Sequence, residues 1–432
     1  MEGLLNVYDV FVERGFVSAV TDEKGVRDLL GRERVTCYIG FDPTAPSLHV
    51  GSLVPIMALV HMQRAGHRPI ALVGGGTALI GDPSGKSEMR QVLTHEQVNL
   101  NAAALKGQLS RFIHSGTSDG ALLLNNADWL TQLNYIEFLR DIGRHFSVNR
   151  MLAAESYRMR LETGLNFIEF NYMLLQSYDF YHLFNNYECA VQMGGNDQWG
   201  NIVAGIDLIR RLTGKEAFGI TFPLITTSLG QKMGKTEKGT IWLDPNLTTP
   251  YDYYQYWVNC DDRDVERFLS LFTFLPMDEI REAGRLRDAE LNMAKAVLAY
   301  EATKIAHGEE AARSARQAAV SVFKAKPVSP GILPSSTIPR GESTTDDSAI
   351  SRVVKSRAEL EKGIPAYKLF TEANLCASQG ESRRLISQGG GYINDRKITS
   401  FDELIGLKDF SGQPKIYLRK GKKKYSVVEI EG

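Results

Sequence analysis

The stretch "RVTCYIGFDPTAPSLHVGS" (residues 34–52), together with the residues directly after it, predicts a strand, a turn and a helix in succession. Residues 34–41 are rich in β-branched and aromatic side chains, which predicts a strand. The segment "DPTAPS" (42–47) is typical of a turn. Apolar residues of 53–66 recur at helical spacing and stop at a glycine, which predicts a helix with a glycine C-terminus.

The same order of strand and helix recurs along the chain. "RPIALVGGG" (68–76) predicts a second buried strand, and "CAVQMGGNDQWGN" (189–201) predicts a third that runs into glycines before a helix. Strands that alternate with helices predict a parallel, doubly wound α/β sheet of the Rossmann-like kind. Ligands of such sheets bind where strands end and loops open, so we expect the functional residues there.

Composition divides the rest of the chain. Residues 262–323 are helical in composition, and 326–347 are rich in Pro, Ser and Thr. Residues 364–432 hold twelve Lys and Arg against eight Asp and Glu, a local charge of +4. We expect four parts, in chain order: a Rossmann-like catalytic domain over 1–230 with a connective insertion at about 100–190, a mobile Lys loop and helical domain over 231–325, a linker over 326–360, and a small α+β domain over 361–432.

The overall composition is that of an ordinary globular protein. Of the 432 residues, 43% are hydrophobic and 23% are charged, and the net charge is −1, so any nucleic-acid binding depends on local basic patches. The four cysteines are far apart, which predicts free thiols in a reducing compartment rather than disulfides or a zinc site. The chain lacks the basic start of a signal peptide and any run of membrane-spanning length, so we expect a soluble, cytoplasmic protein.

Three loops carry residues suited to phosphate groups. The turn before residue 53 offers backbone N–H groups, Thr44 and His49 as donors, and Gly51 for close approach of a ligand. "GDPSGKSEMR" (81–90) and "GQKMGKTEKGTIWL" (230–243) each place two cations, Lys86 and Arg90 or Lys232 and Lys235, beside glycines. Each loop alone is also compatible with an ordinary solvated turn or surface hairpin.

A polar helix face follows in "NYMLLQSYDF" (171–180). Tyr172, Gln176 and Asp179 lie at positions i, i+4 and i+7 and therefore share one face. A phenol, an amide and a carboxylate make a poor core stripe, because each buried polar group needs a partner. The pattern favours a polar ligand against this face; the alternative is an exposed polar face.

Taken together and in this order, the motifs resemble the class I aminoacyl-tRNA synthetases, and within them the bacterial-type tyrosyl-tRNA synthetases. "YIGFDPTAPSLHVGS" stands at the first signature of the class, "KMGKT" at its mobile Lys loop, and "GGNDQWGN" at its ribose-binding strand end. The resemblance covers essentially the whole chain. It implies ATP-dependent activation of L-tyrosine to tyrosyl-adenylate, followed by transfer of the tyrosyl group to the 3′ end of tRNA(Tyr).

The resemblance also implies roles for matching positions. The tyrosine-binding residues would be Tyr38, Asp82, Tyr172, Gln176, Asp179 and Gln198. The ATP-binding residues would be Gly40, Asp42, Gly51, Ser52, Gly195, Asp197 and Lys235. The catalytic residues around the γ-phosphate and the leaving pyrophosphate would be Thr44, His49, Lys86, Arg90, Lys232 and Lys235.

Within these sets, Tyr38 and Asp179 would hydrogen-bond the tyrosine hydroxyl, so phenylalanine would leave both groups unpaired. ATP would enter as a substrate with Mg²⁺, and we expect no dedicated metal site and no tightly bound cofactor. The class also implies a homodimer. Tryptophan activation is the competing substrate assignment, and the Tyr38–Asp179 pair argues against it because it suits a phenol.

The C-terminal part resembles a small RNA-binding domain of a ribosomal small-subunit protein, through "SRRLISQGGGYINDRK" (382–397) and "RKGKKKYSVV" (419–428). Phosphate contacts by its basic residues would position the tRNA. The candidates are Arg383, Arg384, Arg396, Lys397, Arg419 and Lys420. The alternative is a solvated basic face.

One signature position departs from the class, because Ser52 stands where the second signature His is expected. A shorter, uncharged hydroxyl could weaken transition-state binding by about 1–3 kcal/mol. The alternative is a former synthetase that only binds structured RNA. We interpret the motif as altered but working, because the other signature residues are present.

Overall fold

The computed structural model describes residues 6–84, 93–114, 120–161, 164–236, 239–323, 327–341, 350–394, 396–421 and 424–431. The chain forms two compact units, which are described separately. Unit 1 comprises residues 1–249, 260–291 and 333–335, and unit 2 comprises residues 250–259, 292–332 and 336–432.

Unit 1 is built on a six-stranded sheet with the order β1-β6-β5-β2-β3-β4. Neighbouring strands are parallel except for β1, which pairs antiparallel with β6. The strands are β1 (Ala19–Val20), β2 (Thr36–Phe41), β3 (Arg68–Val73), β4 (Leu122–Asn125), β5 (Cys189–Gly195) and β6 (Phe218–Phe222). The predicted doubly wound α/β sheet is therefore confirmed.

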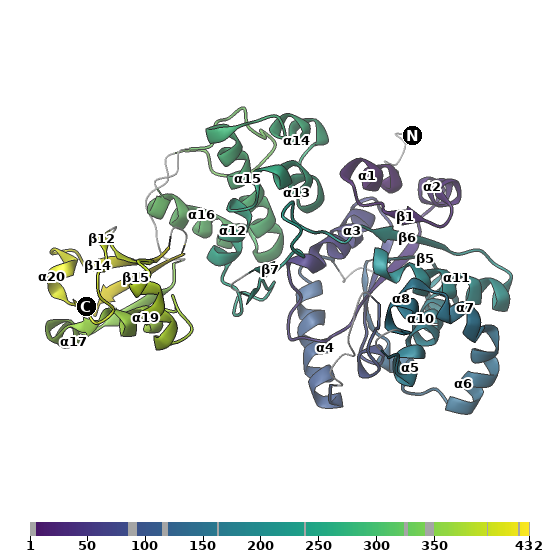
Figure 1. Cartoon of the computed structure of the whole chain (residues 1–432). Coiled ribbons are helices and arrows are strands. Elements are labelled where there is room, and N and C mark those ends of the chain that lie inside the picture. Colours follow the sequence, from purple (N-terminus) through teal and green to yellow (C-terminus); the bar gives the residue numbers. More distant parts are fainter. Residues whose placement is uncertain are drawn as a thin grey trace. The chain divides into compact units, whose positions relative to one another are not determined.

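Helices cover both faces of this sheet, with α3 and α4 on one face and α10 and α11 on the other (Figure 1). Helix α3 ends before Gly66, whose φ of 87° suits a glycine, as the sequence predicts. Strand order reverses at β2, which lies between β3 and β5. Such a switch point is where open α/β sheets bind ligands. Apart from the short helices between β4 and α10, the helices of this unit are α1 (Val7–Arg14), α2 (Glu23–Arg32), α3 (Leu53–Arg64), α4 (His95–Leu109), α10 (Tyr172–Tyr187), α11 (Trp199–Thr213), α13 (Val265–Phe272) and α14 (Met277–Ala283).

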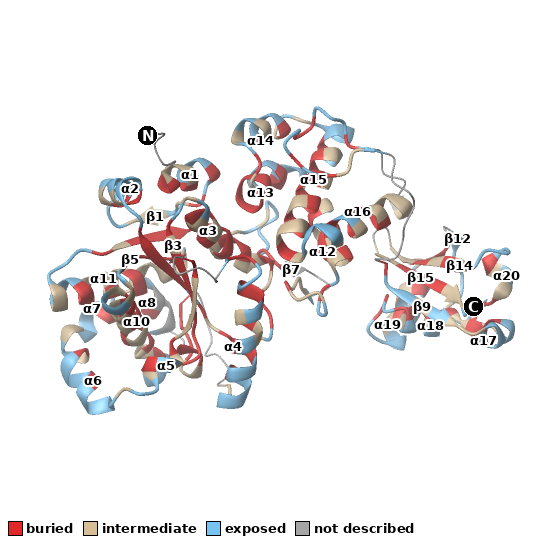
Figure 2. Cartoon of the chain, turned by 180° about the vertical axis from the view of Figure 1, so that it is seen from behind, coloured by how far each residue is buried: buried red, intermediate tan, exposed pale blue. Residues whose placement is uncertain are grey.

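Between β4 and α10 the chain forms short helices around one apolar cluster that includes Phe138, Met151 and Tyr157. Their outer faces are largely exposed, as the pale α6 in Figure 2 illustrates. These helices are α5 (Ala127–Leu130), α6 (Tyr135–Asp141), α7 (Val148–Leu152), α8 (Glu155–Leu161) and α9 (Phe167–Phe170).

Unit 2 contains long helices and a small α+β domain. The helices α15 (Asp288–His307) and α16 (Glu309–Phe323) lie within the stretch of helical composition, 262–323, and α12 (Pro250–Val258) precedes it. The first four residues of α15 belong to unit 1. The small domain has a five-stranded sheet, β12-β11-β14-β15-β9, in which β9 runs parallel to β15. Its elements are β9 (Arg352–Lys355), α17 (Arg357–Lys362), β10 (Ile364–Pro365), α18 (Ala366–Glu372), α19 (Gln379–Ser387), β11 (Gly391–Ile393), β12 (Arg396–Lys397), β13 (Leu404–Ile405), α20 (Leu407–Phe410), β14 (Lys415–Lys420) and β15 (Lys424–Ile430).

The sequence predicts a linker over residues 326–360, whereas the structure has β9 and most of α17 in the last part of this range. Val353, Leu360 and Val428 belong to the same apolar cluster, which explains why this segment is ordered against the small domain. No helix among the described residues is long and apolar enough to cross a membrane.

Candidate active site

The residues expected at the tyrosine hydroxyl lie in the buried centre of unit 1. Tyr38 on β2 and Asp179 on α10 are both only 2% exposed. The Tyr38 hydroxyl is buried and has no hydrogen-bond partner among the described residues. Burial, followed by the nearby Asp179, raises the pKa of Tyr38 well above its usual value. Together they form an unpaired donor and an acceptor suited to a phenol.

Two side chains that the sequence did not reveal hold the Asp179 carboxylate. Trp129 Nε1 donates to Asp179 Oδ1 at 2.7 Å, and Asn126 Nδ2 donates to Asp179 Oδ2 at 2.8 Å. The Trp129 ring is stacked on His182, with ring centroids 4.3 Å apart. Burial raises the pKa of Asp179 to about 7, although both hydrogen bonds favour the ionised form and oppose this shift.

A buried polar network extends from Asp179 to the carboxyl end of β2. Asn126 also donates to Thr77 Oγ1 at 3.0 Å, and Thr77 donates to Asp42 Oδ1 at 2.8 Å. Asp42 accepts a further hydrogen bond from the Tyr172 hydroxyl at 3.0 Å. Asp42, Thr77 and Asn126 follow β2, β3 and β4, so the parallel sheet brings them together at one edge.

A second network joins Asp82, Gln176 and Gln198, three more of the residues expected to bind tyrosine. Gln198 Nε2 donates to Asp82 Oδ2 at 2.7 Å. Asn201 Nδ2 lies 3.0 Å from Gln176 Oε1 and 3.2 Å from Gln198 Oε1. Asn201 was not among the predicted residues, and it links the polar face of α10 to the segment after β5. The network gathers one carboxylate and several amide groups, which suit an ammonium and a carboxylate.

The strand end of β5 carries Gly195 and Asp197. A Cβ atom on Gly195 would lie 2.5 Å from Asp197 Oδ1, so the backbone must be glycine for the carboxylate to approach it this closely. Asp197 lies in the turn η4 (Asn196–Gln198), directly before α11. The acidic side chain therefore stands at the end of a parallel strand, where a ribose can be bound.

The first signature forms the turn η1 (Val50–Ser52) before α3. His49 caps this turn, and its Nδ1 accepts a hydrogen bond from Gly51 N at 3.0 Å. A side chain at Gly51 would displace its neighbours, because a Cβ would lie 2.7 Å from His49 Cε1, 2.9 Å from His49 Nδ1 and 3.1 Å from the Met233 carbonyl oxygen. Ser52 precedes α3 and makes no capping hydrogen bond with its side chain. Gly40 and Thr44, which precede this turn in the chain, are exposed.

The Lys loop lies against this signature. Strands β7 (Lys235–Thr236) and β8 (Gly239–Thr240) form its hairpin, and residues 241–243 pair with residues 48–50 through Val50 N to Ile241 O at 3.0 Å and Leu243 N to Leu48 O at 2.8 Å. Lys232 is exposed. The backbone of Lys235 lies in β7, while Lys86 and Arg90 lie outside the described residues.

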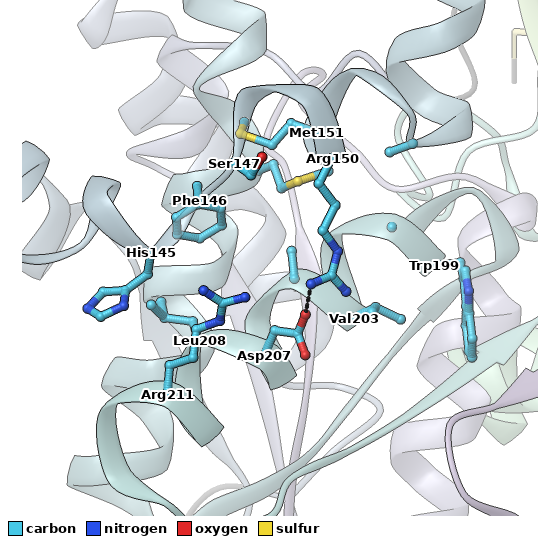
Figure 3. A pocket seen from close by; sticks show the side chains of 14 residues that line it. His145, Phe146, Ser147, Arg150, Met151, Trp199, Val203, Asp207, Leu208 and Arg211 are labelled. Atoms are coloured by element: carbon cyan, nitrogen blue, oxygen red, sulfur yellow. Dashed lines mark ion pairs between the residues drawn. The ribbon is translucent and has the colours of Figure 1, made fainter.

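A separate cavity of about 190 Å³ lies between α7, α10 and α11 (Figure 3). Met151, Met173 and Leu208 line it, and Arg150 pairs with Asp207 at 2.6 Å. It contains none of the residues expected to bind tyrosine or ATP. Cavity size alone therefore does not identify the reacting site in this unit.

The basic candidates of the small domain divide into two kinds. Arg383 lies 4.1 Å from the Tyr367 ring centroid and Arg419 lies 3.9 Å from that of Tyr392. Arg396, by contrast, pairs with Glu403 at 2.7 Å and Asp409 at 3.0 Å, and Lys420 pairs with Glu381. Arg384 and Lys397 are exposed. Arg419 also donates from Nη1 to the Gly421 carbonyl oxygen at 2.9 Å, whereas Arg383 is exposed and stacks on its ring, which suits contact with phosphate.

Comparisons with known proteins agree with this arrangement. The family described as "tRNA synthetases class I (W and Y)" matches residues 31–324, and the "Tyrosine–tRNA ligase SYY-like C-terminal domain" matches residues 350–428. The tyrosine–tRNA ligase of Syntrophus aciditrophicus is 63% identical over 428 residues, 99% of this chain and 100% of the relative. That of Desulfatibacillum aliphaticivorans is 60% identical over 423 residues, 98% of each chain.

A solved structure is similar as well. The C-terminally truncated mitochondrial tyrosyl-tRNA synthetase of Aspergillus nidulans superposes with a TM-score of 0.67 at 30% identity, over 75% of this chain and 95% of that one. Sequence relatives, family matches and fold all agree with the motifs at the strand ends. The chain therefore belongs to the tyrosine–tRNA ligases of the class I aminoacyl-tRNA synthetases.

Proposed function

We propose that the strand-end residues of unit 1 activate L-tyrosine with ATP and then pass the tyrosyl group to the 3′ end of tRNA(Tyr). The observation that carries this proposal is the buried Tyr38 hydroxyl, which has no hydrogen-bond partner among the residues that the structure describes and lies near the buried carboxylate of Asp179. A phenol can accept from Tyr38 and donate to Asp179 at the same time.

This pair also accounts for amino-acid choice. Phenylalanine has no hydroxyl and would leave both buried groups unpaired, which costs free energy. The indole of tryptophan can donate but not accept, so it would leave the Tyr38 hydroxyl without a partner. Asn126 and Trp129 fix both oxygens of Asp179, so the acceptor cannot turn away to suit a different side chain.

In the first step, the tyrosine carboxylate attacks the α-phosphate of ATP, a new P–O bond forms, and the bond to pyrophosphate breaks. Asp82, Tyr172 and Gln176 would hold the α-amino group, and Gln198 would lie near the carboxylate. Gly195 and Asp197 would bind the ribose, while Gly40, Asp42, Gly51 and Ser52 would line the remainder of the ATP site. The donors at the phosphates and leaving pyrophosphate would be Thr44, His49, Lys86, Arg90, Lys232 and Lys235.

Catalysis in this scheme comes from positioning and from charge stabilisation, and no covalent enzyme nucleophile takes part. In the second step, a terminal ribose hydroxyl of the tRNA attacks the activated carbonyl and AMP leaves. Among the described residues, no three His, Cys, Asp or Glu side chains gather to hold a metal ion. We propose that Mg²⁺ arrives with the phosphates of ATP, where it would neutralise charge.

Trapping of the intermediate tests this function. Purified protein is mixed with ATP and labelled tyrosine, phenylalanine or tryptophan, and the protein-bound adenylate is isolated by gel filtration. We expect adenylate with tyrosine, and transfer of its label to added tRNA(Tyr) in a single turnover. Adenylate formed equally well with tryptophan would contradict the role given to Tyr38 and Asp179.

We also propose a homodimer that forms through the insertion between β4 and α10. Its helices expose several large apolar side chains: Tyr135 (58% exposed), Ile136 (70%), Val148 (55%), Leu161 (50%) and Phe167 (65%). Because these helices share one apolar cluster, their outer faces form a surface that a second copy can cover. Sedimentation equilibrium should show a dimer that Phe167→Asp weakens, and a wild-type monomer at micromolar concentration would contradict the proposal.

The small domain is the proposed tRNA anchor, in the cytoplasm where tRNA is charged. Arg383, which is exposed and held on a tyrosine ring, is a stronger candidate for phosphate contacts than Arg396 and Lys420, which already pair with carboxylates. Arg383→Gln should weaken tRNA binding and reduce its salt dependence, whereas Arg396→Gln should change binding less. Equal effects of the two changes would contradict this ranking.

A further inference from the structure

The segment that carries Lys232 is part of a hairpin with two attachments. We define the Lys hairpin as residues 225–236 and 239–243. Inside it, Thr226 and Lys232 form an antiparallel bridge, Thr227 N donates to Gln231 O at 2.8 Å, and Met233 N donates to Ile225 O at 3.1 Å. Its later half pairs with residues 48–50, as described above. Its earlier half contacts the start of α13.

The contact at α13 is made by a buried carboxylate and an arginine. Asp264 is 2% exposed and accepts the backbone N–H of Ser228 with both oxygens, at 2.9 and 3.2 Å. Arg267, one turn later, donates from Nη2 to Asp264 Oδ1 at 2.7 Å and to the Thr226 carbonyl oxygen at 2.6 Å. Two backbone groups of the hairpin are thereby bound by charged side chains.

These contacts are stronger than ordinary loop contacts, for two reasons. Hydrogen bonds to ionised groups are about twice as strong as neutral ones. A buried carboxylate that loses its partners is costly, so the arrangement resists rearrangement. Since Thr226 is the bridge partner of Lys232, the position of the Thr226 backbone determines the position of the Lys232 backbone.

We propose that Asp264 and Arg267 are positioning residues for activation: they fix the segment from Thr226 to Ser228 and thereby hold Lys232 where it meets the leaving pyrophosphate. This proposal rests on the role proposed for Lys232 above. The lysine reaches its working place because its hairpin is fastened at both edges, to the first signature on one side and to α13 on the other. Loss of the contacts to Asp264 and Arg267 should leave the other residues of the site in place and misplace only the Lys232 side chain.

A double-mutant cycle with Lys232→Ala and Asp264→Asn tests the proposal by tyrosine-dependent exchange of pyrophosphate into ATP. Asparagine keeps the volume and one acceptor for Ser228 N but cannot accept from Arg267 as a carboxylate does. We expect Asp264→Asn to lower kcat by about tenfold, with the KM for tyrosine unchanged, because a charged hydrogen-bond network is lost. In the Asp264→Asn background, Lys232→Ala should lower kcat by less than about twofold further, since residues in one network do not act additively.

The control is Asp207→Asn, on α11. Asp207 is also a partly buried carboxylate, paired with Arg150 at 2.6 Å and Arg210 at 3.0 Å, and it contacts no part of the Lys hairpin in the interactions described. This change should leave exchange within about twofold of wild type, as a loss of surface ion pairs does. Should Asp264→Asn fail to fold, as judged by thermal unfolding, Arg267→Gln replaces it, because the Arg267 side chain is 43% exposed and its removal leaves no hole in the core.

Two results overturn the proposal, and they differ from each other. If Lys232→Ala alone leaves exchange at the wild-type rate, Lys232 has no catalytic role, and both that assignment and its positioning fail. If Lys232→Ala alone is impaired but shows its full effect in the Asp264→Asn or Arg267→Gln background, Lys232 keeps its role and only the positioning by α13 is wrong.

Discussion

The change Tyr38→Phe should have opposite effects on stability and on tyrosine binding. The hydroxyl of Tyr38 is buried and finds no hydrogen-bond partner in the described part of the chain, and its ring packs against Phe180 with centroids 5.4 Å apart. Phenylalanine keeps the ring and removes only the unpaired oxygen. An unpaired buried polar group costs about 1–3 kcal/mol, so the free variant should be more stable than wild type by about that amount.

Tyrosine binding should weaken at the same time. Loss of one neutral hydrogen bond to the substrate hydroxyl costs about 0.5–1.5 kcal/mol, which raises the Kd for tyrosine by roughly twofold to tenfold. The Kd for phenylalanine should not rise, because that ligand has no hydroxyl to lose a partner. The variant is therefore expected to discriminate less well between the two amino acids.

Urea unfolding without ligands and equilibrium dialysis with each amino acid measure the two effects. The matched control is Tyr157→Phe, because the Tyr157 hydroxyl is also buried but donates to Phe170 O at 2.9 Å and accepts from Met173 N at 3.3 Å. The control should lose stability, and Tyr38→Phe should gain it. If Tyr38→Phe instead destabilises the protein, or leaves the Kd for tyrosine unchanged, the reasoning about the unpaired hydroxyl is wrong.

Three further changes test other parts of the site. Burial raises the pKa of Asp179 to about 7, so between about pH 4 and pH 7 the folded chain retains a proton that the unfolded chain has released. As the pH rises through this range, the free energy of unfolding should fall by up to about 1.4 kcal/mol per pH unit. Asp179→Asn lacks this contribution, and an identical pH profile of urea unfolding for both proteins would contradict the shifted pKa. Gly51→Ala would place a Cβ 2.7 Å from His49 Cε1 and 3.1 Å from Met233 O. It would displace the His49 ring and the adjoining Lys hairpin, so pyrophosphate exchange should slow by about tenfold while tyrosine binding is kept. Unchanged exchange in this variant would show that the close approach is not needed. Ser52→His should speed adenylate formation in stopped-flow measurements by about fivefold or more, and a slower variant would mean that the hydroxyl already serves ATP better.

Much of the fold could be predicted from local patterns. Periodicity and turn residues predict a strand within 34–41, a helix within 53–66 and a strand within 189–201. The structure has β2, α3 and β5 inside these ranges, and each begins within two residues of the expected start. The position of the site at the strand ends follows from the parallel sheet alone. The shared face of Tyr172 and Asp179 was also visible as helical spacing, and both side chains are buried.

Other features depend on contacts between distant segments, which no local pattern encodes. Asn126 and Trp129 follow β4 in a stretch of unremarkable spacing, yet they hold the carboxylate of Asp179 fifty or more residues later. Asp264 contacts Ser228 in the same way, across thirty-six residues. The strand β9 was assigned to the linker, because it is only four residues long and its partner, β15, lies at the other end of the small domain.

Tyrosine-dependent exchange of pyrophosphate into ATP, measured for wild type and for Lys235→Ala, tests the central claim most directly. We expect robust exchange in wild type, with Ser52 in its natural place, and loss of most of this exchange in Lys235→Ala while tyrosine binding is retained. Absence of exchange in wild type, with tRNA binding intact and activity gained through Ser52→His, would contradict this claim and would favour a protein that binds RNA without activating tyrosine.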